Sequence, residues 1–257
     1  MTEPAVSFCT TNYNCAHVLQ RHLESIYSNF KESEFEYIVV DSHSKDGSYG
    51  LLLDFSKDHS NFTVVSKKCI RGIGRQLAFE RSKGKFIVVV DTDTVYDRVA
   101  REFVEICKAK RPEHAVQAIF VGVYPREIWE AAGGSRDYNY GEDFELWMRI
   151  WKMGKMKWYP VRMGTNFKEP GAKDSYDYLS SRYERFEKLS RFARREYDSL
   201  RLRRFEKEDL VEIWKSNTVD LGLGELEDSF FGARRSPPLS KLPIHYARSI
   251  WQILTER

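Results

Sequence analysis

The feature that most constrains this chain is an uninterrupted apolar stretch, Phe86–Val90, that is followed at once by two acidic residues. Three of its five residues are valine, which favours a short strand buried on both faces of a sheet. The strand stops at Asp91 and Asp93, with only Thr92 between them. In an open α/β sheet, ligands bind outside the carboxyl ends of the strands. The stretch therefore predicts a ligand site at this strand end.

The two carboxylates at the strand end are candidate ligands for a divalent metal ion. They can converge on one point only if the backbone turns between them. Mg²⁺ and Mn²⁺ prefer oxygen ligands and share their coordination shell with substrate phosphates, so a cation that holds a phosphate fits this position. The alternative is that acidic residues simply mark the end of a strand, and a D-x-D pair alone does not decide between the two.

Length and composition favour a soluble globular protein. The 257 residues suffice for one large α/β domain with an appendage. Hydrophobic residues make up 42% and charged residues 31%, which excludes a disordered chain. The longest apolar run is far shorter than the ~20 residues that cross a bilayer, and the N-terminus lacks a signal-peptide pattern. Four cysteines without metal-binding spacing are expected to be reduced, so we expect a cytoplasmic protein.

The first part of the chain alternates between expected strands and expected helices. Runs with strand character occur at 5–10, 35–40, 62–65 and 86–90. Apolar residues at helical spacing lie between them, after a cap at Asn14, a turn ending at Gly47 and a loop before Arg71. This order predicts an α/β fold with a mostly parallel, Rossmann-like sheet and helices on both faces.

The second half of the chain is less regular. We expect helices around 99–106 and 142–154, a strand over 115–123, and a last strand over 156–159 that Pro160 ends. A boundary near Pro170–Gly171 separates a sheet domain, 1–170, from a helical C-terminal extension, 171–257.

The C-terminal extension is basic. Between Arg185 and Arg204, eight Lys or Arg stand against three acidic residues, whereas the net charge of the whole chain is only +3. Aromatic residues are interleaved with these charges, as in a helix that lies on anionic lipid. The alternative is a helix packed on the sheet domain with its arginines in solvent. We leave open a peripheral contact of 176–205 with the inner face of the cell membrane.

Several short motifs lie in a fixed order along the first 160 residues. They are Val39-Val-Asp-Ser-His-Ser-Lys-Asp-Gly47, Gly72-Ile-Gly-Arg75, Asp91-Thr-Asp93, Gly133-Gly134 and Glu142-Asp143. In this order they resemble the family-2 glycosyltransferases, which have the GT-A fold. The resemblance covers roughly residues 5–160 and leaves out the C-terminal third. The Q-x-x-R-W element of processive synthases is missing, which favours transfer of a single sugar.

The resemblance implies an inverting transfer of one hexose from a nucleotide-sugar donor to a hydroxyl acceptor. The donor would be of the GDP-mannose or UDP-glucose type, the acceptor is left open between soluble and lipid-linked, and no nucleic-acid partner is expected. Asp91 and Asp93 would hold Mn²⁺ or Mg²⁺ against the diphosphate, with Thr92 as a further donor contact. Such a cation neutralises the charge that builds on the leaving group.

Three more residues are candidates for binding the donor. By the resemblance, Asp41 would contact the base or the ribose; its alternative role is to cap the loop that follows it. Arg71 and Arg75 flank the glycines at a helix N-terminus, where backbone N–H groups and the helix dipole favour anions. Either guanidinium could grip the diphosphate or the sugar, or could simply pair with a carboxylate.

Asp143 is the candidate catalytic residue. In an inverting transfer, one carboxylate takes the proton of the acceptor hydroxyl as that oxygen attacks the anomeric carbon. The alternative role of Asp143 is to cap the helix that begins there, and the two roles are compatible. Glu142, its neighbour, is a candidate for orienting the acceptor.

Two other classes of function compete with a glycosyltransferase. A sugar-phosphate nucleotidyltransferase would also place acids and a metal at strand ends, but it normally has a Gly-rich, Lys-bearing loop after its first strand. The corresponding residues here, Thr10–Asn14, contain neither Gly nor Lys. The other alternative is a non-catalytic nucleotide-sugar-binding protein, against which the presence of every expected acid argues.

Overall fold

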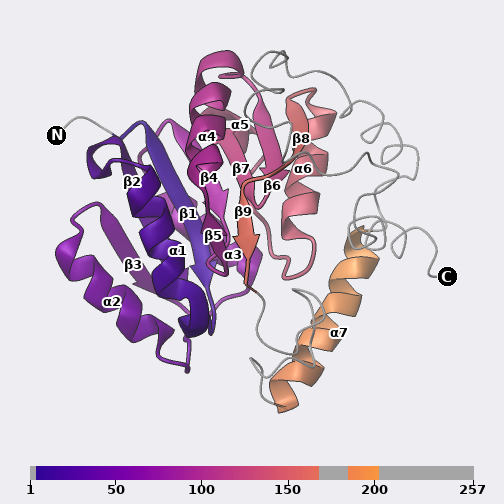
Figure 1. The fold of residues 1–257 in the computed structure, drawn as a ribbon. Helices are drawn as coiled ribbons and strands as arrows, with labels where there is room; N and C mark the ends of the chain where they lie inside the picture. The colour runs from indigo at the N-terminus through magenta and orange to yellow at the C-terminus, as the bar shows by residue number, and fades with distance from the viewer. Residues whose placement is uncertain (1–3, 168–184, 203–257) are drawn as a thin grey trace.

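Strands and helices alternate along most of the chain, as the computed structural model shows for residues 4–167 and 185–202 (Figure 1). The strands are β1 (Val6–Asn12), β2 (Phe35–Asp41), β3 (Phe62–Ser66), β4 (Phe86–Val90), β5 (Thr94–Tyr96), β6 (Ala115–Ile119), β7 (Val121–Pro125), β8 (Met156–Arg162) and β9 (Gly164–Asn166). The helices are α1 (Ala16–Asn29), the 3-10 helix η1 (Glu32–Glu34), α2 (Ser48–Asp58), α3 (Arg71–Arg81), α4 (Arg98–Lys110), α5 (Arg126–Ala131), α6 (Glu142–Lys152) and α7 (Arg185–Leu202).

The main sheet has the order β3-β2-β1-β4-β7-β6-β8. Neighbouring strands from β3 to β4 pair in parallel, β7 pairs antiparallel with β4 and with β6, and β6 pairs in parallel with β8. The prediction of a mostly parallel sheet is therefore confirmed. Parallel pairing brings the carboxyl ends of β1, β2 and β4 to one edge of the sheet, which is where the predicted site residues follow their strands.

The core forms two layers, one on each face of the sheet. Phe86, Val88 and Val90 of β4 join the layer that α1, α2 and α4 cover. Ile87 joins the layer that α3, α5 and α6 cover. Burial on both faces was predicted from the unbroken apolar run, and it is confirmed. Each side chain of this size contributes about 1.5–3 kcal/mol when it is fully buried.

The expected strand over 115–123 is wrong, because it is two strands. β6 and β7 form an antiparallel hairpin, and Phe120 turns the chain between them with a φ of 75°. Bulky residues rarely adopt this left-handed conformation, and hairpin turns usually contain Gly, Asn or Asp. The turn at Phe120 therefore has no recognisable signal in the sequence. The Phe120 carbonyl oxygen accepts a hydrogen bond from the Tyr96 hydroxyl at 2.8 Å, which helps to hold the turn.

The prediction that Pro160 ends the last strand is also wrong. β8 continues through Pro160 to Arg162. β8 is the edge strand of the main sheet, so one of its sides has no neighbouring strand. A proline, which lacks a backbone N–H, is tolerated in an edge strand because no partner on that side needs the N–H. The pairing with β6 shifts register between Gln117 and Ile119, opposite this part of β8.

The start of α1 also differs from the expectation. The N-cap position is Cys15 rather than Asn14, and Asn14 instead accepts a hydrogen bond from the Lys45 backbone N–H at 2.8 Å. The Ala16 N–H donates to Asp46 at 2.8 Å, so a carboxylate from the next loop caps the helix. The Val39–Gly47 motif therefore contributes to the fold as well as to the candidate site.

Helix α7 confirms that part of the basic segment is helical. The proposed boundary at Pro170–Gly171 lies outside the described residues, and a membrane contact of 176–205 stays a prediction. Among the described helices, we find none whose length and hydropathy would suit a bilayer crossing. Figure 1 shows α7 beside the lower end of the domain. The contacts of α7 with Tyr140 and Gly141 lie just before the start of α6.

Candidate functional site

The backbone turns between the two aspartates, as a shared ligand requires. The Thr94 N–H donates to the Asp91 carbonyl at 3.1 Å, which closes a tight turn over the D-x-D residues. The Asp91 side chain is 43% exposed at this turn. Thr92 is buried, and its hydroxyl lies 3.4 Å from both the Thr11 carbonyl oxygen and the Cys15 sulfur. Thr92 therefore holds the turn from within, and a direct contact of its side chain with a donor stays a prediction.

Asp93 is held by the small second sheet. Asn166, at the end of β9, donates to Asp93 Oδ1 at 2.8 Å, and the Phe167 N–H donates to the Asp93 carbonyl at 2.7 Å. β9 pairs with β5, which directly follows Asp93 in the chain. The sequence analysis predicted neither of these three-residue strands, because they are too short to show a pattern.

Two buried core residues, His22 and Tyr96, hold the backbone at the end of β4 in place. His22 of α1 bonds the Thr94 carbonyl through Nδ1 at 2.7 Å and the Tyr37 hydroxyl through Nε2. Burial lowers the pKa of His22 to about 4, so its imidazole is neutral at pH 7. The Tyr96 hydroxyl accepts the Asp91 N–H at 2.9 Å while it donates to Phe120. Burial raises the pKa of Tyr96 well above 10, so it remains a donor.

The Tyr96 hydroxyl provides a test of this support. We expect Tyr96→Phe to cost about 1–3 kcal/mol of stability, since it leaves the Phe120 carbonyl and the Asp91 N–H, both partly buried, without their partner. The loosened Asp91 should also bind Mn²⁺-nucleotide more weakly. Urea denaturation and calorimetric titration measure the two effects. Tyr27→Phe, which removes a phenol bonded to Asn61 elsewhere, is the control. Unchanged nucleotide binding in Tyr96→Phe would mean that Asp91 keeps its place without Tyr96.

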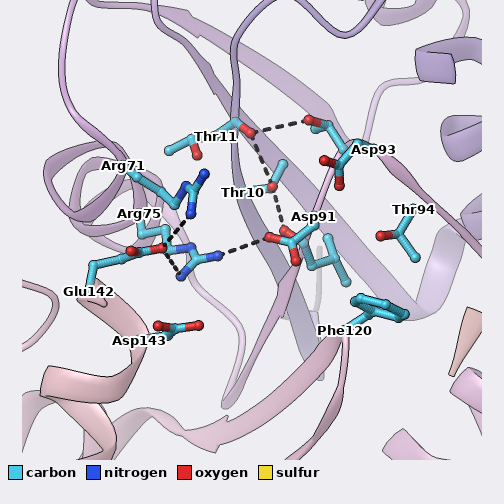
Figure 2. A network of polar contacts seen from close by, with 12 residues as sticks. Thr10, Thr11, Arg71, Arg75, Asp91, Asp93, Thr94, Phe120, Glu142 and Asp143 are labelled. Carbon is cyan, nitrogen blue, oxygen red and sulfur yellow. Dashed lines mark hydrogen bonds and ion pairs between the residues drawn. The ribbon is translucent and has the colours of Figure 1, made fainter. Parts of the chain in front are cut away.

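Arg75 joins the D-x-D residues to the acidic pair at the start of α6 (Figure 2). Its Nη2 lies 3.0 Å from Asp91 Oδ1, and its Nη1 lies 2.8 Å from Glu142 Oε1. Arg71 reaches the same oxygen of Glu142 at 3.4 Å. Burial by itself would lower the pKa of Arg75, but the two carboxylates outweigh it and raise that pKa, so the guanidinium is always charged.

This arrangement favours pairing with carboxylates, rather than donor binding, as the role of Arg71 and Arg75. Both pair with carboxylates of the protein, and a contact with the donor diphosphate stays a prediction. The N-terminus of α3 is also covered, because the Gly72 N–H donates to the Tyr138 carbonyl at 2.9 Å. A Cβ on Gly72 would lie 2.0 Å from the Arg136 carbonyl oxygen. The Gly-x-Gly turn is therefore required for close packing, and this helix end already contacts protein groups.

Asp143 lies beside the Arg75–Glu142 pair (Figure 2) and is partly buried. Burial and the adjacent Glu142 raise the pKa of Asp143 to about 6, against the opposing effect of Arg75. The group is therefore mainly a carboxylate at pH 7, and a stronger base than an ordinary aspartate. Gly141, with a φ of 64°, occupies the N-cap position, so the alternative role of Asp143 as N-cap is wrong. Asp143 instead accepts the next N–H, that of Phe144, at 2.8 Å.

Asp41 is fully buried at the end of β2. Its Oδ1 accepts hydrogen bonds from Asn12 at 2.8 Å and from the Ser44 hydroxyl at 2.6 Å, and its Oδ2 accepts one from the Ser44 N–H at 3.0 Å. The loop-capping role is thus present in the structure, and contact with a base or ribose stays a prediction. Glu142 is equally buried, so its role here is to pair with Arg75 and Arg71.

The donor set at the strand end fits a hard cation that shares its shell with a diphosphate. Asp91 and Asp93 supply carboxylate oxygens at a partly exposed turn. The part of the chain that the structure describes has no group of three or more His, Cys, Asp or Glu placed to hold a metal ion. Mg²⁺ in such sites usually binds through one or two carboxylates together with substrate phosphates, so two ligands from the protein are sufficient.

A family model matches the sequence of this chain, and several solved structures share its fold. The family model described as glycosyl transferase family 2 matches residues 7–167, from β1 to the residue after β9. No curated protein matches the sequence. The structure is similar to that of a mannosyltransferase from Pyrobaculum calidifontis in complex with GDP-Man and Mn²⁺, with a TM-score of 0.61 and 18% identity over 98% of this chain and 81% of that chain.

Two further solved structures share the fold at lower similarity. S. aureus TarS, residues 1–349, in complex with UDP-GlcNAc gives a TM-score of 0.55 with 14% identity over 100% of this chain and 82% of that chain. Glucosyl-3-phosphoglycerate synthase from Mycobacterium tuberculosis, in complex with Mn²⁺, UDP-Glc and phosphoglyceric acid, gives 0.54 with 12% identity over 65% of this chain and 73% of that chain.

Proposed function

This chain belongs to glycosyl transferase family 2, and we propose that it is an inverting, metal-dependent enzyme that transfers one hexose from a nucleoside-diphosphate sugar to a hydroxyl acceptor. The observation that carries the proposal is the Asp91–Arg75–Glu142 bridge. The bridge joins Asp91 to Glu142, the neighbour of Asp143 in the chain. This supports the inference that Asp91 and Asp93 bind the leaving diphosphate while Asp143 activates the attacking hydroxyl. A displacement at the anomeric carbon needs both in one place.

In the proposed reaction, Asp91 and Asp93 would hold Mn²⁺ or Mg²⁺ against the diphosphate. When bound, the cation supplies a positive charge that stabilises the departing nucleoside diphosphate. Asp143 accepts the proton of the acceptor hydroxyl as its oxygen attacks. Arg75 keeps Asp91 in place and stabilises the carboxylate form of Asp143. Because the acceptor oxygen displaces the nucleoside diphosphate in one step, from the opposite face of the sugar, the anomeric configuration is inverted.

Unused hydrogen-bonding atoms at the site support a bound ligand. Asn12 Oδ1, Arg75 Nε, Glu142 Oε2 and Asn166 Oδ1 are buried without a hydrogen-bond partner in the described part of the chain. These four side chains contact Asp41, Asp91, Arg71 and Asp93 respectively, or share a partner with them. An unsatisfied buried polar atom costs about 1–3 kcal/mol, and a ligand or water that reached these four atoms would remove that cost.

The donor can be identified by thermal-shift screening. We expect one class of nucleotide sugar, with GDP-mannose and UDP-glucose as the first two probes, to raise the Tm in the presence of Mn²⁺. A ligand at 100 times its Kd stabilises by about 2.7 kcal/mol, an effect that such a scan resolves easily. The neighbours solved with GDP-Man, UDP-GlcNAc and UDP-Glc motivate the choice of probes.

The same screen distinguishes the proposal from its competitors. A Tm that rises with donor while the sugar is neither transferred nor hydrolysed would favour the non-catalytic nucleotide-sugar-binding alternative. No response to GDP- or UDP-sugars, with or without Mn²⁺, would contradict the proposed donor class. We also propose a location in the cytoplasm, where free cysteines such as the four of this chain stay reduced.

A further inference from the structure

The loop 137–141 is the last part of the connection between α5 and α6 and ends immediately before Glu142 and Asp143. One side chain of α7, Asp198, is fully buried against this loop. Its Oδ2 accepts the backbone N–H of Asn139 at 2.8 Å and that of Tyr140 at 3.2 Å. A carboxylate is stable in such a position only when charged or polar groups surround it. The contact therefore fixes the backbone of the loop.

Two arginines of α7 reinforce this contact. Arg194 Nε lies 3.0 and 3.1 Å from the two oxygens of Asp198, and its Nη2 donates to the Asp137 carbonyl at 2.6 Å. Arg201 also donates to the Asp137 carbonyl, at 2.5 Å. Leu202 packs with the aromatic rings of the loop and against Gly141, where an added Cβ would lie 2.7 Å from it. The helix thus holds the loop at both of its ends.

Helix α3 holds the opposite side of the same loop. The Tyr138 carbonyl accepts the Gly72 N–H, and Asn139 Oδ1 accepts the Arg71 N–H at 3.4 Å. The loop is therefore fixed between α3 and α7. Since Glu142 follows it directly, the position of the loop decides whether Glu142 can reach Arg75, and where Asp143 points.

We propose that α7 is part of the catalytic unit, with Asp198 as a positioning residue that sets the place of Glu142 and Asp143 through the 137–141 loop. This inference rests on the proposed function, because it assigns Asp143 the role of base. α7 lies outside residues 7–167, which the family model matches. The helix therefore lies outside the matched region but fixes the loop that precedes Glu142 and Asp143 within that region. A helix that served only to contact lipid would not need a buried aspartate turned toward the domain.

Asp198→Asn tests the proposal with little change in volume. Asn cannot satisfy the two loop N–H groups and Arg194 together, because one of its two polar atoms is now a donor. We expect hydrogen exchange in peptides covering 137–145 to accelerate by about fivefold or more. Glu36→Gln is the matched control, since Glu36 Oε1 also accepts two successive backbone N–H groups, those of Lys83 and Gly84. It should accelerate exchange at 83–84 only.

Hydrolysis of the donor provides the kinetic readout without an identified acceptor. With Mn²⁺ and whichever of GDP-mannose or UDP-glucose raises the Tm, Asp198→Asn should lower kcat by roughly 10–100-fold, the order expected for a small misplacement of a reacting group. The Kd for the nucleotide should stay within a few-fold, because Asp91 and Asp93 are held by other elements. Glu36→Gln should retain normal turnover.

The outcomes separate this inference from the proposed function. Unchanged exchange at 137–145, or normal kcat despite faster exchange, would overturn the positioning role of Asp198. An equal fall in kcat in Glu36→Gln would mean a general loss of stability and would overturn it as well. If Asp198→Asn does not fold, Arg194→Gln loosens the same contact and replaces it in both measurements. A wild-type protein that neither binds nor hydrolyses a nucleotide sugar would refute the proposed function, while the exchange data would still decide whether α7 fixes the loop.

Discussion

Replacing Asp143 by Asn is expected to lower kcat by roughly 10²–10⁴-fold, the usual contribution of a general base. A sugar hydroxyl is a poor nucleophile at neutral pH, and Asp143 is a carboxylate of raised pKa beside the Arg75–Glu142 pair. The amide cannot take a proton, but it can still accept the Phe144 N–H. Donor affinity should stay within a few-fold, because under the proposed function the diphosphate would be bound through Asp91, Asp93 and their cation. Steady-state kinetics and calorimetric titration measure the two quantities.

The pH profile gives an independent check on the same residue. The wild-type kcat should fall as the pH drops through about 6, where Asp143 takes up its proton. A folded-state pKa above the unfolded value means that the native state binds this proton more tightly, so the group itself adds stability as the pH falls from about 6 toward 4. Over the same range His22, whose pKa burial lowers to about 4, destabilises the native state as the pH falls, so a thermal melt at each pH is needed to separate loss of activity from unfolding. Asp143→Asn should lack this limb of the kcat profile.

A control for Asp143 is available on the neighbouring helix. Glu127→Gln also removes one carboxylate from the first turn of a helix, α5, and should leave kcat unchanged. The product of the wild-type reaction should carry the anomeric configuration opposite to that of the donor. Retention of configuration, or near-normal turnover in Asp143→Asn, would show that Asp143 is not the base.

Removing the second aspartate of the D-x-D pair should abolish transfer. We expect Asp93→Ala to lose both activity and the Mn²⁺ dependence of nucleotide binding, since Mg²⁺ and Mn²⁺ rely on carboxylate ligands. The fold should survive, because β5 and β9 remain paired through their backbones. Binding of GDP or UDP measured with and without Mn²⁺ gives a readout that does not require turnover.

Chelation tests the same point in the wild-type protein. Excess EDTA should stop transfer, and added Mn²⁺ or Mg²⁺ should restore it. Asp54→Ala, which removes an exposed carboxylate on α2, should respond to metal like the wild type. Full transfer activity in excess EDTA would refute a metal-dependent mechanism.

The elements that the sequence predicted well are those with a clear local pattern, such as a run of apolar residues or a helix start. β4 has five apolar residues in a row, and both core layers use it. α6 begins at Glu142 as expected and presents Asp143 in its first turn. The turn over Asp91 and Asp93 was a condition of the metal hypothesis, and the Thr94–Asp91 hydrogen bond meets it. In each case the information is local, so a single sequence is enough.

The contacts that support the site could not be predicted, because they join distant parts of the chain. His22 and Thr94 are separated by 72 positions, and Arg75 and Glu142 by 67. No spacing rule indicates such pairs. The Phe120 turn was missed for a different reason, since its conformation is one that phenylalanine rarely adopts. Asp198 was counted only as one acid among many basic residues, although its burial is what connects α7 to the domain.

The covered N-terminus of α3 has a consequence for how the enzyme would respond to its surroundings. Its first N–H groups already contact Asn139 and Tyr138, so they contribute little attraction to an incoming diphosphate. Under the proposed function, most of the charge of the donor must then be balanced by a cation on Asp91 and Asp93. By mass action, the fraction of enzyme loaded with donor would follow the free divalent-metal level of the cell. Metal supply, as well as sugar supply, would set the rate of glycosylation.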